Sequence, residues 1–323
     1  MDANSFKTWI HRLEELTFRQ REDLRRRLSE PQMSSGGLSP GLGIVPPTCC
    51  PHCQGQTYRS WGQSHGLPRY RCPRCSRTFN ALSGTALARL RHRELWSMHA
   101  IALIEGWSLR DEAKRLNINK NTAFLWRHRF IQQPAVHQAE HESGIVEADE
   151  TFFLESFKGQ RQLTRPARVR GGVASKRGIS AEQIPVLVVR DRSGHTADFV
   201  LARLDSQHVT AALRPLIDSD AILCSDSAGV YSAFARETGI IHHAINVRQG
   251  QRVIDKVFHI QNVNAYDSRL KNWIRRFHGV ATKYLPHYLG WRRLLERYRD
   301  AISPDLCIKE ALGRPLLQQV IGT

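Results

Sequence analysis

Two aspartates lie on predicted strands that could bring them together at one cation. Asp149 lies in GIVEADETFF (144–153), where apolar and acidic residues alternate as in a strand with one face toward a polar site. Asp226 follows the apolar run in AILCSDSAGVYSAFA, and a helix is predicted after it. Carboxylate oxygens are ligands that Mg²⁺ and Mn²⁺ accept. The pair therefore predicts a divalent-metal site on an α/β sheet.

A later helix offers a third oxygen ligand. HIQNVNAYDSRLKNW (259–273) has a helical pattern, and Asn264 and Lys271 lie two helical turns apart on one face. An amide oxygen can ligate Mg²⁺, although it is neutral and weaker than a carboxylate. With the two aspartates it would hold two metal ions, one activating an attacking water or hydroxyl and the other stabilising a leaving oxygen. Asp267, one turn further on, and Asp255, before the helix, remain alternative third ligands.

Four cysteines have the spacing of a zinc site. CCPHC and YRCPRC each contain a C-x2-C turn, and the spacer between them is long enough for a hairpin to bring the turns together. This pattern predicts a tetrahedral structural Zn²⁺ site that folds a small ribbon, with the ligands Cys50, Cys53, Cys72 and Cys75. Cys49 is a poorer candidate ligand. Arginines and aromatic residues interleave along the ribbon, which suits phosphate contact: Arg59, Arg69, Arg71, Arg74 and Arg77 with Tyr58, Trp61 and Tyr70.

The segment 93–131 predicts three helices, the last two with the outline of a helix-turn-helix. Ser108 is the expected N-cap of SLRDEAKRLNI, and a short turn near Asn117 leads into NKNTAFLWRHRFI. Such a motif reaches DNA base edges from the start of its second helix. The predicted DNA contacts here are Asn119, Lys120, Asn121, Thr122 and Arg127.

The charge of the chain favours a polyanionic partner. Its 323 residues contain 47 Lys+Arg against 30 Asp+Glu, a formal net charge of +17. Nucleic acid is favoured over an anionic membrane because no basic amphipathic helix dominates the chain. We expect a soluble, cytoplasmic protein without a membrane partner, because no apolar run resembles a signal peptide or a membrane span. Seven cysteines, mostly in one window, fit a reducing compartment.

Two further basic regions fit nucleic acid. The stretch 158–177 contains seven Lys or Arg, several glycines and no acid, which predicts a loop that orders on DNA, with Arg168 and Arg170 among its contacts. Arg275 and Arg276 lie on the same predicted helix as Asn264. His259, near the start of that helix, is expected either to contact DNA or to cap the helix.

The pattern along the chain predicts a multidomain, mainly α/β protein. An amphipathic period, a Pro-, Gly- and Ser-rich stretch, the cysteine window, a helical stretch and an alternation of strands and helices follow one another. The predicted units are an amphipathic helix (1–30), a linker (31–47), a zinc ribbon (48–80), a helix-turn-helix region (85–135), a mixed-sheet catalytic domain (140–300) and a C-terminal tail (301–323).

These motifs resemble a known family. The chain is similar to transposases of bacterial insertion sequences that carry an N-terminal zinc ribbon and an ISXO-like catalytic domain, members of the ribonuclease-H-like DDE superfamily. The resemblance covers about residues 48 to 297. It rests on CPHC with YRCPRCSRTFNALSGTALARLR, VEADETFF with SFKG, IPVLVVRDRSG, LCSDSAGVYSAFA followed by HH, and HIQNVNAYDSRLKNWIRRFHGVATKYLPHYLGWRRLLE.

The resemblance implies a catalytic set of Asp149, Asp226 and Asn264, followed by Lys271, in a branch where asparagine replaces the glutamate of many relatives. Lys271 would hold a phosphate oxygen near the developing charge. The implied protein has a ribonuclease-H-like fold, binds double-stranded DNA at the element's terminal inverted repeats and at the target, and acts as a homo-oligomer near the nucleoid. The alternative is an inactive, element-derived, sequence-specific DNA-binding protein.

Overall fold

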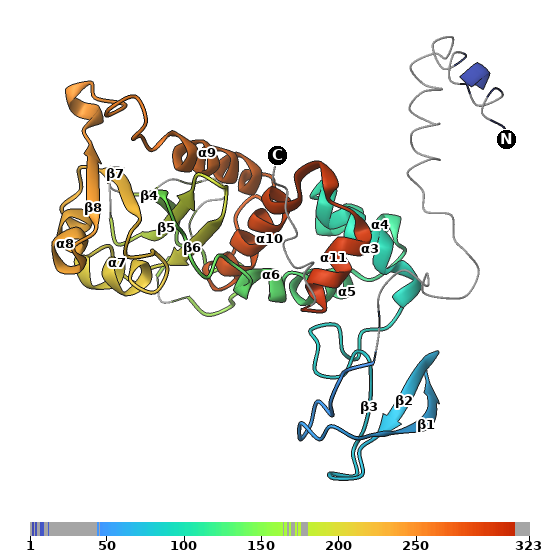
Figure 1. Cartoon of the computed structure of the whole chain (residues 1–323). Coiled ribbons are helices and arrows are strands. Elements are labelled where there is room, and N and C mark those ends of the chain that lie inside the picture. The colour runs from blue at the N-terminus through green and yellow to red at the C-terminus, as the bar shows by residue number, and fades with distance from the viewer. Residues whose placement is uncertain are drawn as a thin grey trace.

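In the computed structural model, the described residues are 2, 4, 7–9, 12, 44, 46–163, 165–166, 168, 172, 174–175 and 180–313. Most of the predicted amphipathic helix and most of the predicted linker lie outside them, as does Arg170. Within the described part, three regions follow the chain: a small antiparallel ribbon, a group of helices, and a larger α/β region (Figure 1).

The α/β region is built on a five-stranded mixed sheet with the order β6-β5-β4-β7-β8. The first three strands along the chain form an antiparallel meander, and the last two run parallel to β4. β4 is therefore central and carries Asp149, while β7, its parallel neighbour, ends at Asp226. The strands are β4 (Ile145–Leu154), β5 (Gln183–Asp191), β6 (Thr196–Val200), β7 (Ile222–Asp226) and β8 (Ile241–Ile245).

Helices cover both faces of this sheet. Alternate residues of β5 divide between two hydrophobic clusters, because successive side chains of a strand point to opposite faces. Leu187 and Val189 pack with α7 (Ser206–Leu213) and α8 (Gly229–Thr238). Val186 and Val188 belong to the cluster that contains α9 (Gln261–Arg275) and α10 (Leu285–Tyr298). Burial on both faces explains why IPVLVV is continuously apolar.

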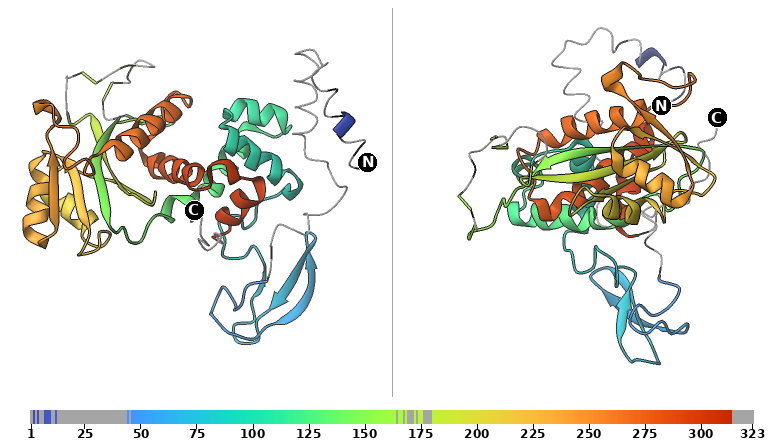
Figure 2. Two further views of the ribbon diagram at one scale, coloured as in Figure 1. Left: turned by 45° about the horizontal axis from the view of Figure 1, so that its top comes forward. Right: turned by 90° about the vertical axis from the view of Figure 1, so that its left-hand side faces the viewer.

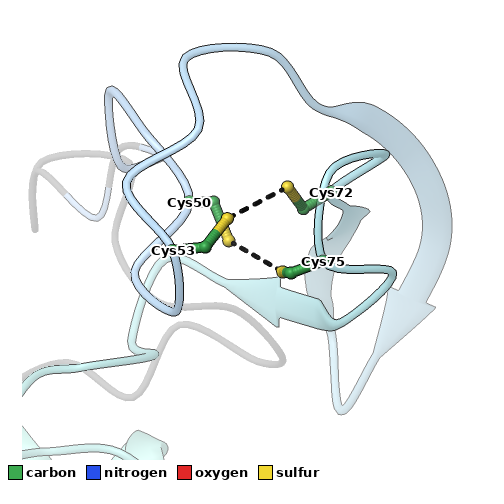
Figure 3. A group of neighbouring side chains, drawn as sticks. All are labelled: Cys50, Cys53, Cys72 and Cys75. Carbon is green, nitrogen blue, oxygen red and sulfur yellow. Dashed lines mark hydrogen bonds between the residues drawn. The ribbon is translucent and has the colours of Figure 1, made fainter.

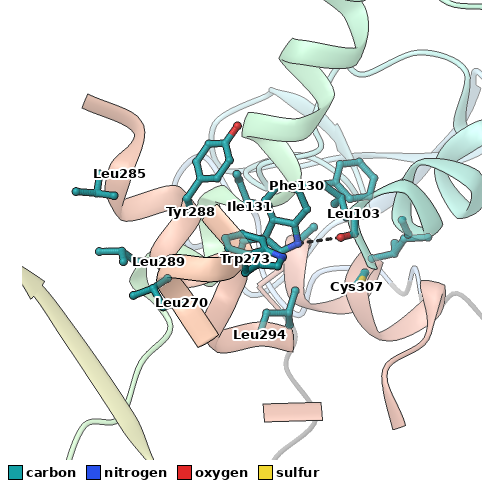
Figure 4. Close-up of a cluster of buried hydrophobic side chains, with 14 of the residues drawn as sticks. Leu103, Phe130, Ile131, Leu270, Trp273, Leu285, Tyr288, Leu289, Leu294 and Cys307 are labelled. Atoms are coloured by element: carbon teal, nitrogen blue, oxygen red, sulfur yellow. Dashed lines mark hydrogen bonds between the residues drawn. The ribbon is translucent and has the colours of Figure 1, made fainter. Parts of the chain in front are cut away.

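The helical region shares its core with the α/β region (Figure 4). Its helices are α3 (Trp96–Glu105), α4 (Leu109–Arg115), α5 (Lys120–Phe130) and α6 (Gln132–Val136), preceded by a short turn η3 (Arg93–Leu95). Trp291 of α10 donates a hydrogen bond from its indole nitrogen to the carbonyl oxygen of Leu103, at 3.1 Å. Gly290 lies against the backbone of α6, where a Cβ atom would have no room. The two regions are therefore joined by close packing.

The expected C-terminal tail contains a packed helix. Helix α11 (Pro304–Ala311) begins with Ser303 as its N-cap and contacts α3, α5 and α6. Its Cys307 and Ile308 are buried in the core that the helical and α/β regions share. The tail prediction is corrected for these residues. The apolar side of α11 packs against helices that come much earlier in the chain, mainly α3 (Trp96–Glu105).

The ribbon stands apart from the other two regions in both further views (Figure 2). It has the order β1-β2-β3, with β1 (Arg59–Ser64), β2 (Leu67–Arg71) and β3 (Thr78–Asn80) all antiparallel. The remaining short turns of the chain are η4 (Val247–Gln249), η5 (Thr282–Tyr284) and η6 (Arg299–Ala301). No helix among the described residues is long and apolar enough to cross a bilayer.

Candidate functional site

Three carboxylates lie close together where β7 ends beside β4. Asp149, Glu150 and Asp226 each place one carboxylate oxygen within 4.8 Å of the others. Asp226 also accepts a hydrogen bond from the backbone N–H of Ala228, at 2.9 Å, which fixes its side chain at the end of β7. Glu150 was not among the predicted site residues, although its place beside Asp149 was the available signal. The oxygen-rich set suits a hard divalent cation such as Mg²⁺ or Mn²⁺.

The electrostatics of this cluster favour a cation. Burial raises the pKa of Asp149 to about 6, and Asp226 raises it as well, while a backbone hydrogen bond and the Lys271 cation lower it. Burial likewise raises the pKa of Glu150 to about 7, and the hydroxyl group of the buried Tyr231 lies beside it. Packed carboxylates hold protons because their negative charges repel one another in a poorly solvated site. A divalent cation would remove that penalty.

Helix α9 carries three candidate residues in different environments. Lys271 is near enough to Asp149 to lower its pKa, and Asn264 is exposed two turns earlier. Asp267 is only 6% exposed, and its Oδ1 atom has no hydrogen-bond partner among the described residues. Burial, and secondarily Asp149, raises the pKa of Asp267 to about 8. Asp255 is exposed in a turn before α9 and does not belong to the described acidic cluster.

Glu147 fixes the start of α9 against β4. Its carboxylate accepts hydrogen bonds from the backbone N–H groups of Asn262 and Val263, at 2.8 and 3.0 Å, and from the Asn262 side chain at 3.0 Å. It is fully buried and pairs with Arg192 at 3.1 Å. A carboxylate at a helix N-terminus satisfies N–H groups that lack partners within the helix.

His259 belongs to the same network. Its Nε2 atom lies 2.7 Å from Nη1 of Arg192, and its Nδ1 atom lies 3.4 Å from Glu147. Its Nδ1 also lies 3.2 Å from the backbone nitrogen of Gln261 at the start of α9. His259 was expected either to contact DNA or to cap the helix, and these contacts favour the role at the helix start.

A second set of contacts fixes the far end of α9. Lys158 donates from Nζ to the carbonyl oxygens of Phe277 and Gly279, at 3.2 and 2.8 Å. The backbone of Ser156 exchanges hydrogen bonds with Thr282, at 2.8 and 2.9 Å. Strand β4, which carries Asp149, is therefore tied to both ends of the helix that carries Asn264 and Lys271.

The sheet and the helices that cover it match a known protein family. Residues 142–292 match the ISXO2-like transposase domain. These residues are an ISXO2-like transposase domain. The matched stretch contains all four predicted catalytic residues, which are Asp149, Asp226, Asn264 and Lys271.

Relatives of the whole chain are distant. A protein of the transposable element ISH50 from Halobacterium salinarum, described as uncharacterized, is 24% identical over 245 residues, covering 74% of this chain and 82% of its own. Among solved structures, the Mos1 mariner paired-end complex with Mn has 12% identity and a TM-score of 0.22, over 66% of this chain and 78% of its own. A chain of the simian T-cell lymphotropic virus intasome has 11% identity and a TM-score of 0.30. The match covers 49% of this chain and 50% of that chain, so this chain spans about half of the length of that protein.

Outside the ISXO2-like domain, the four predicted zinc ligands converge (Figure 3). The Sγ atoms of Cys50 and Cys75 are 3.7 Å apart and those of Cys53 and Cys72 are 3.6 Å apart. A tetrahedron with Zn–S bonds of about 2.3 Å has edges of about 3.8 Å, so the spacing fits one zinc ion. Cys49 points away from this cluster, because its thiol donates to Oε1 of Gln54 at 3.0 Å.

The predicted contacts at the start of α5 are accessible. Asn119 caps this helix by accepting from the backbone N–H of Asn121, at 2.8 Å. Asn119, Lys120 and Asn121 are exposed, and Thr122 is half-buried. The turn between α4 and α5 uses Asn117 with a positive φ of 52°, a conformation that asparagine tolerates.

Arg127 is a core residue, which corrects its prediction as a DNA contact. Only 1% exposed, it pairs with the buried Glu112 at 2.8 Å and donates to the carbonyl oxygen of Trp107, also at 2.8 Å. The other oxygen of Glu112 lies 2.6 Å from Nδ1 of the buried His99. A buried charge needs such partners, and this network joins α3, α4 and α5.

Three further predicted DNA contacts have protein partners: Arg275 and Arg276, which are exposed, and Arg168, which is half-buried. Arg276 donates to the carbonyl oxygen of Glu105 at the end of α3, at 3.2 Å. Arg275 donates to the Asn272 side chain at 3.2 Å, and Arg168 pairs with Glu182 at 3.0 Å. These arginines therefore hold parts of the structure together as well as adding positive charge.

Proposed function

We propose that this chain is a metal-dependent DNA transposase that cleaves DNA at its element's ends and joins the freed end to target DNA. The observation that carries the proposal is the meeting of Asp149 and Asp226 on neighbouring parallel strands of an ISXO2-like transposase domain, with carboxylate oxygens within 4.8 Å. The strand order, an antiparallel meander followed by two strands parallel to its first, supports a ribonuclease-H-like assignment for this sheet.

The reaction has two steps of the same kind. In the first, a water oxygen bonds to a phosphorus atom at the element end, the bond from phosphorus to the 3′ oxygen breaks, and that oxygen takes a proton to become a hydroxyl. In the second, this hydroxyl loses its proton as its oxygen bonds to a target phosphorus, and a target 3′ oxygen leaves. Bound Mg²⁺ or Mn²⁺ would supply activation of the attacking oxygen and neutralisation of the leaving one.

Different residues would bind the cations, stabilise the developing charge and hold the DNA. Asp149 and Asp226 would hold the cations, with the Asn264 amide oxygen as a neutral third ligand. Lys271 places a positive charge beside Asp149, where it would orient a phosphate oxygen and stabilise developing negative charge. The helical region and the ribbon would hold duplex DNA, and a homo-oligomer would pair two ends.

The test is cleavage and strand joining on DNA that carries the flanking ends of the gene, in Mg²⁺. We expect products from the wild type and from the control Asp255→Ala, and at least about a hundredfold slower cleavage from Asp149→Ala and Asn264→Ala. Asp267→Asn, a nearly isosteric change at a buried position, should retain cleavage. Cleavage that survives Asn264→Ala and is lost in Asp267→Asn would move the third ligand to Asp267.

The same assay also tests a second candidate function, that of a DNA-binding protein without catalytic activity. Asn264 is exposed and neutral where a carboxylate would bind a cation more strongly. Salt-sensitive binding to the element ends, without product from any version of the chain, would favour the inactive DNA-binding protein over the transposase.

A further inference from the structure

The ribbon places three of its aromatic residues on the face opposite Arg69 and Arg71. Tyr58, Tyr70 and Phe79 pack together beside the zinc-ligand cysteines, with ring centroids 5.0 to 5.8 Å apart. In the pairing register, Tyr70 faces Phe79, whereas Arg71 pairs with Arg59 and Thr78. Because side chains alternate along a strand, the arginines lie on the opposite face of the ribbon.

Trp61 belongs to the face that carries the arginines. The guanidinium carbons of Arg59 and Arg71 lie over its ring, at 5.1 and 4.6 Å from the ring centre. Arg69 is two positions from Arg71 along β2, and its Nε donates to the carbonyl oxygen of Trp61 at 3.1 Å. We call this surface the arginine face: Arg59, Trp61, Arg69 and Arg71.

The arginine face has positive charge without an acidic partner in the part of the chain that the structure describes. Arg59 and Arg71 stand directly opposite each other in the register, and like charges in that position destabilise a sheet. Among the described residues, no carboxylate lies within 4.0 Å of Arg59, Arg69 or Arg71. Between Glu30 and Glu94 the sequence has no Asp or Glu. The same stretch contains eight arginines and no lysine. The ribbon therefore lacks a local counterion for this face.

Two of the guanidinium groups are held in place by the backbone. Arg69 uses Nε for the Trp61 carbonyl, and Arg71 uses Nε for the carbonyl oxygen of Ser76, at 3.3 Å. Among the described residues, the hydrogen bonds of these two side chains use Nε, which leaves the two Nη groups of each as further donors in the same plane. Arginine is suited to bind phosphate through such a pair, and fixing the side chain in advance lowers the entropy lost on binding.

We propose that the arginine face contacts the phosphate backbone of the duplex DNA that the chain binds. The inference rests on the proposed function and adds the surface and the mode of contact. The contact is independent of sequence, because phosphates carry no base identity. Trp61 acts as the support for Arg59 and Arg71, since its ring is already engaged by both guanidinium groups.

The test compares two single charge removals in the zinc-loaded full chain. Arg71→Gln changes the arginine face, and Arg236→Gln removes the same charge from an exposed position on α8, outside the ribbon. Affinity is measured by fluorescence anisotropy over a range of salt concentrations, without chelators, on the element end and on a duplex of shuffled sequence. Zinc content and thermal unfolding of each variant are measured alongside.

For Arg71→Gln we expect roughly tenfold weaker binding to both duplexes and a salt slope smaller by about 1, as for one lost phosphate contact. Trp61→Ala should weaken both affinities in the same way, and Arg236→Gln should bind as the wild type does. Equal effects of Arg71→Gln and Arg236→Gln would overturn the proposal, as would a loss confined to the element end. A wild type that binds no duplex would overturn this inference together with the DNA-binding part of the proposed function. Failed cleavage with normal binding would contradict only the cleavage part of the proposed function and would leave this inference standing.

Discussion

The Glu147 carboxylate accepts a hydrogen bond from the backbone N–H of Asn262, at 2.8 Å, and so joins β4 to the start of α9. The donor is two residues from Asn264, and the acceptor is two residues from Asp149. The distance between those two proposed metal ligands therefore depends on a contact that involves neither of them. Glu147 is in this sense a positioning residue.

Glu147→Ala should raise the Mg²⁺ concentration needed for half-maximal cleavage by about tenfold, because α9 loses its attachment beside Asn264. It should also lower the free energy of unfolding by about 2 to 3 kcal/mol, since three hydrogen bonds to a buried charge are lost. A metal titration of cleavage, at a temperature where the variant is folded, measures the first effect.

Glu142→Gln is the matched control for Glu147→Ala. Glu142 is also buried, neither of its carboxylate oxygens has a hydrogen-bond partner in the described part of the chain, and burial raises its pKa to about 9. We expect it to be neutral, so an amide should replace it without changing the Mg²⁺ requirement. If Glu147→Ala is only destabilised and needs no more Mg²⁺ than this control, the positioning role is wrong.

Stability without metal should fall as the pH rises through the raised pKa values of Asp149 and Glu150, about 6 and 7. Both carboxyl groups ionise less readily in the folded chain than in the unfolded one, so their unfavourable contribution is absent below about pH 4 and complete above pH 7. The loss from Asp149 is of the order of 3 kcal/mol. Mg²⁺ should restore more stability at pH 8 than at pH 5, because protons then no longer compete for the ligands.

Thermal unfolding across pH 4 to 8, with and without Mg²⁺, measures this linkage. Asp149→Asn should unfold at a higher temperature than the wild type at pH 8 without metal, and should gain little from Mg²⁺. An equal gain from Mg²⁺ in both proteins would place the cation elsewhere.

Cys53→Ser should lower the zinc content from one ion per chain, because a structural site needs all four thiolates to hold the ribbon folded. The rest of the chain should stay folded, since the ribbon cysteines form a cluster separate from the main cores. Metal analysis together with circular dichroism measures both effects. Cys49→Ser is the control, as the Cys49 thiol contacts Gln54 and not the other cysteines; the same zinc loss in both variants would contradict the assignment.

Arg127→Ala should lower the free energy of unfolding by about 3 kcal/mol or more, since it leaves the buried Glu112 without its cation. Lys120→Ala, at the exposed start of α5, should weaken DNA binding with little change in stability. Urea unfolding and anisotropy on the element end separate the two effects. Weaker binding by fully folded Arg127→Ala would restore that residue as a DNA contact.

Local patterns in the sequence predicted the residues whose partners lie nearby or on regular elements. The two C-x2-C turns predicted the four cysteines that converge, and the strands around Asp149 and Asp226 predicted neighbours in a sheet. The attachment of Glu147 to Asn262 joins residues 115 positions apart, and no local period shows it. Arg127 was misplaced because an arginine on the second helix of a helix-turn-helix outline resembles a DNA contact unless its buried partner is known.

Helix α11 also sets an order of events during synthesis. The ribbon can fold once Asn80, the last residue of β3, has left the ribosome, because its ligands and strands are contiguous in sequence. The helical region, although it comes next, has Cys307 and Ile308 in its core and must wait for almost the whole chain. Between those moments the nascent protein would have a folded arginine-rich ribbon and an unfinished helical region, so its earliest contacts with DNA would be non-specific ones.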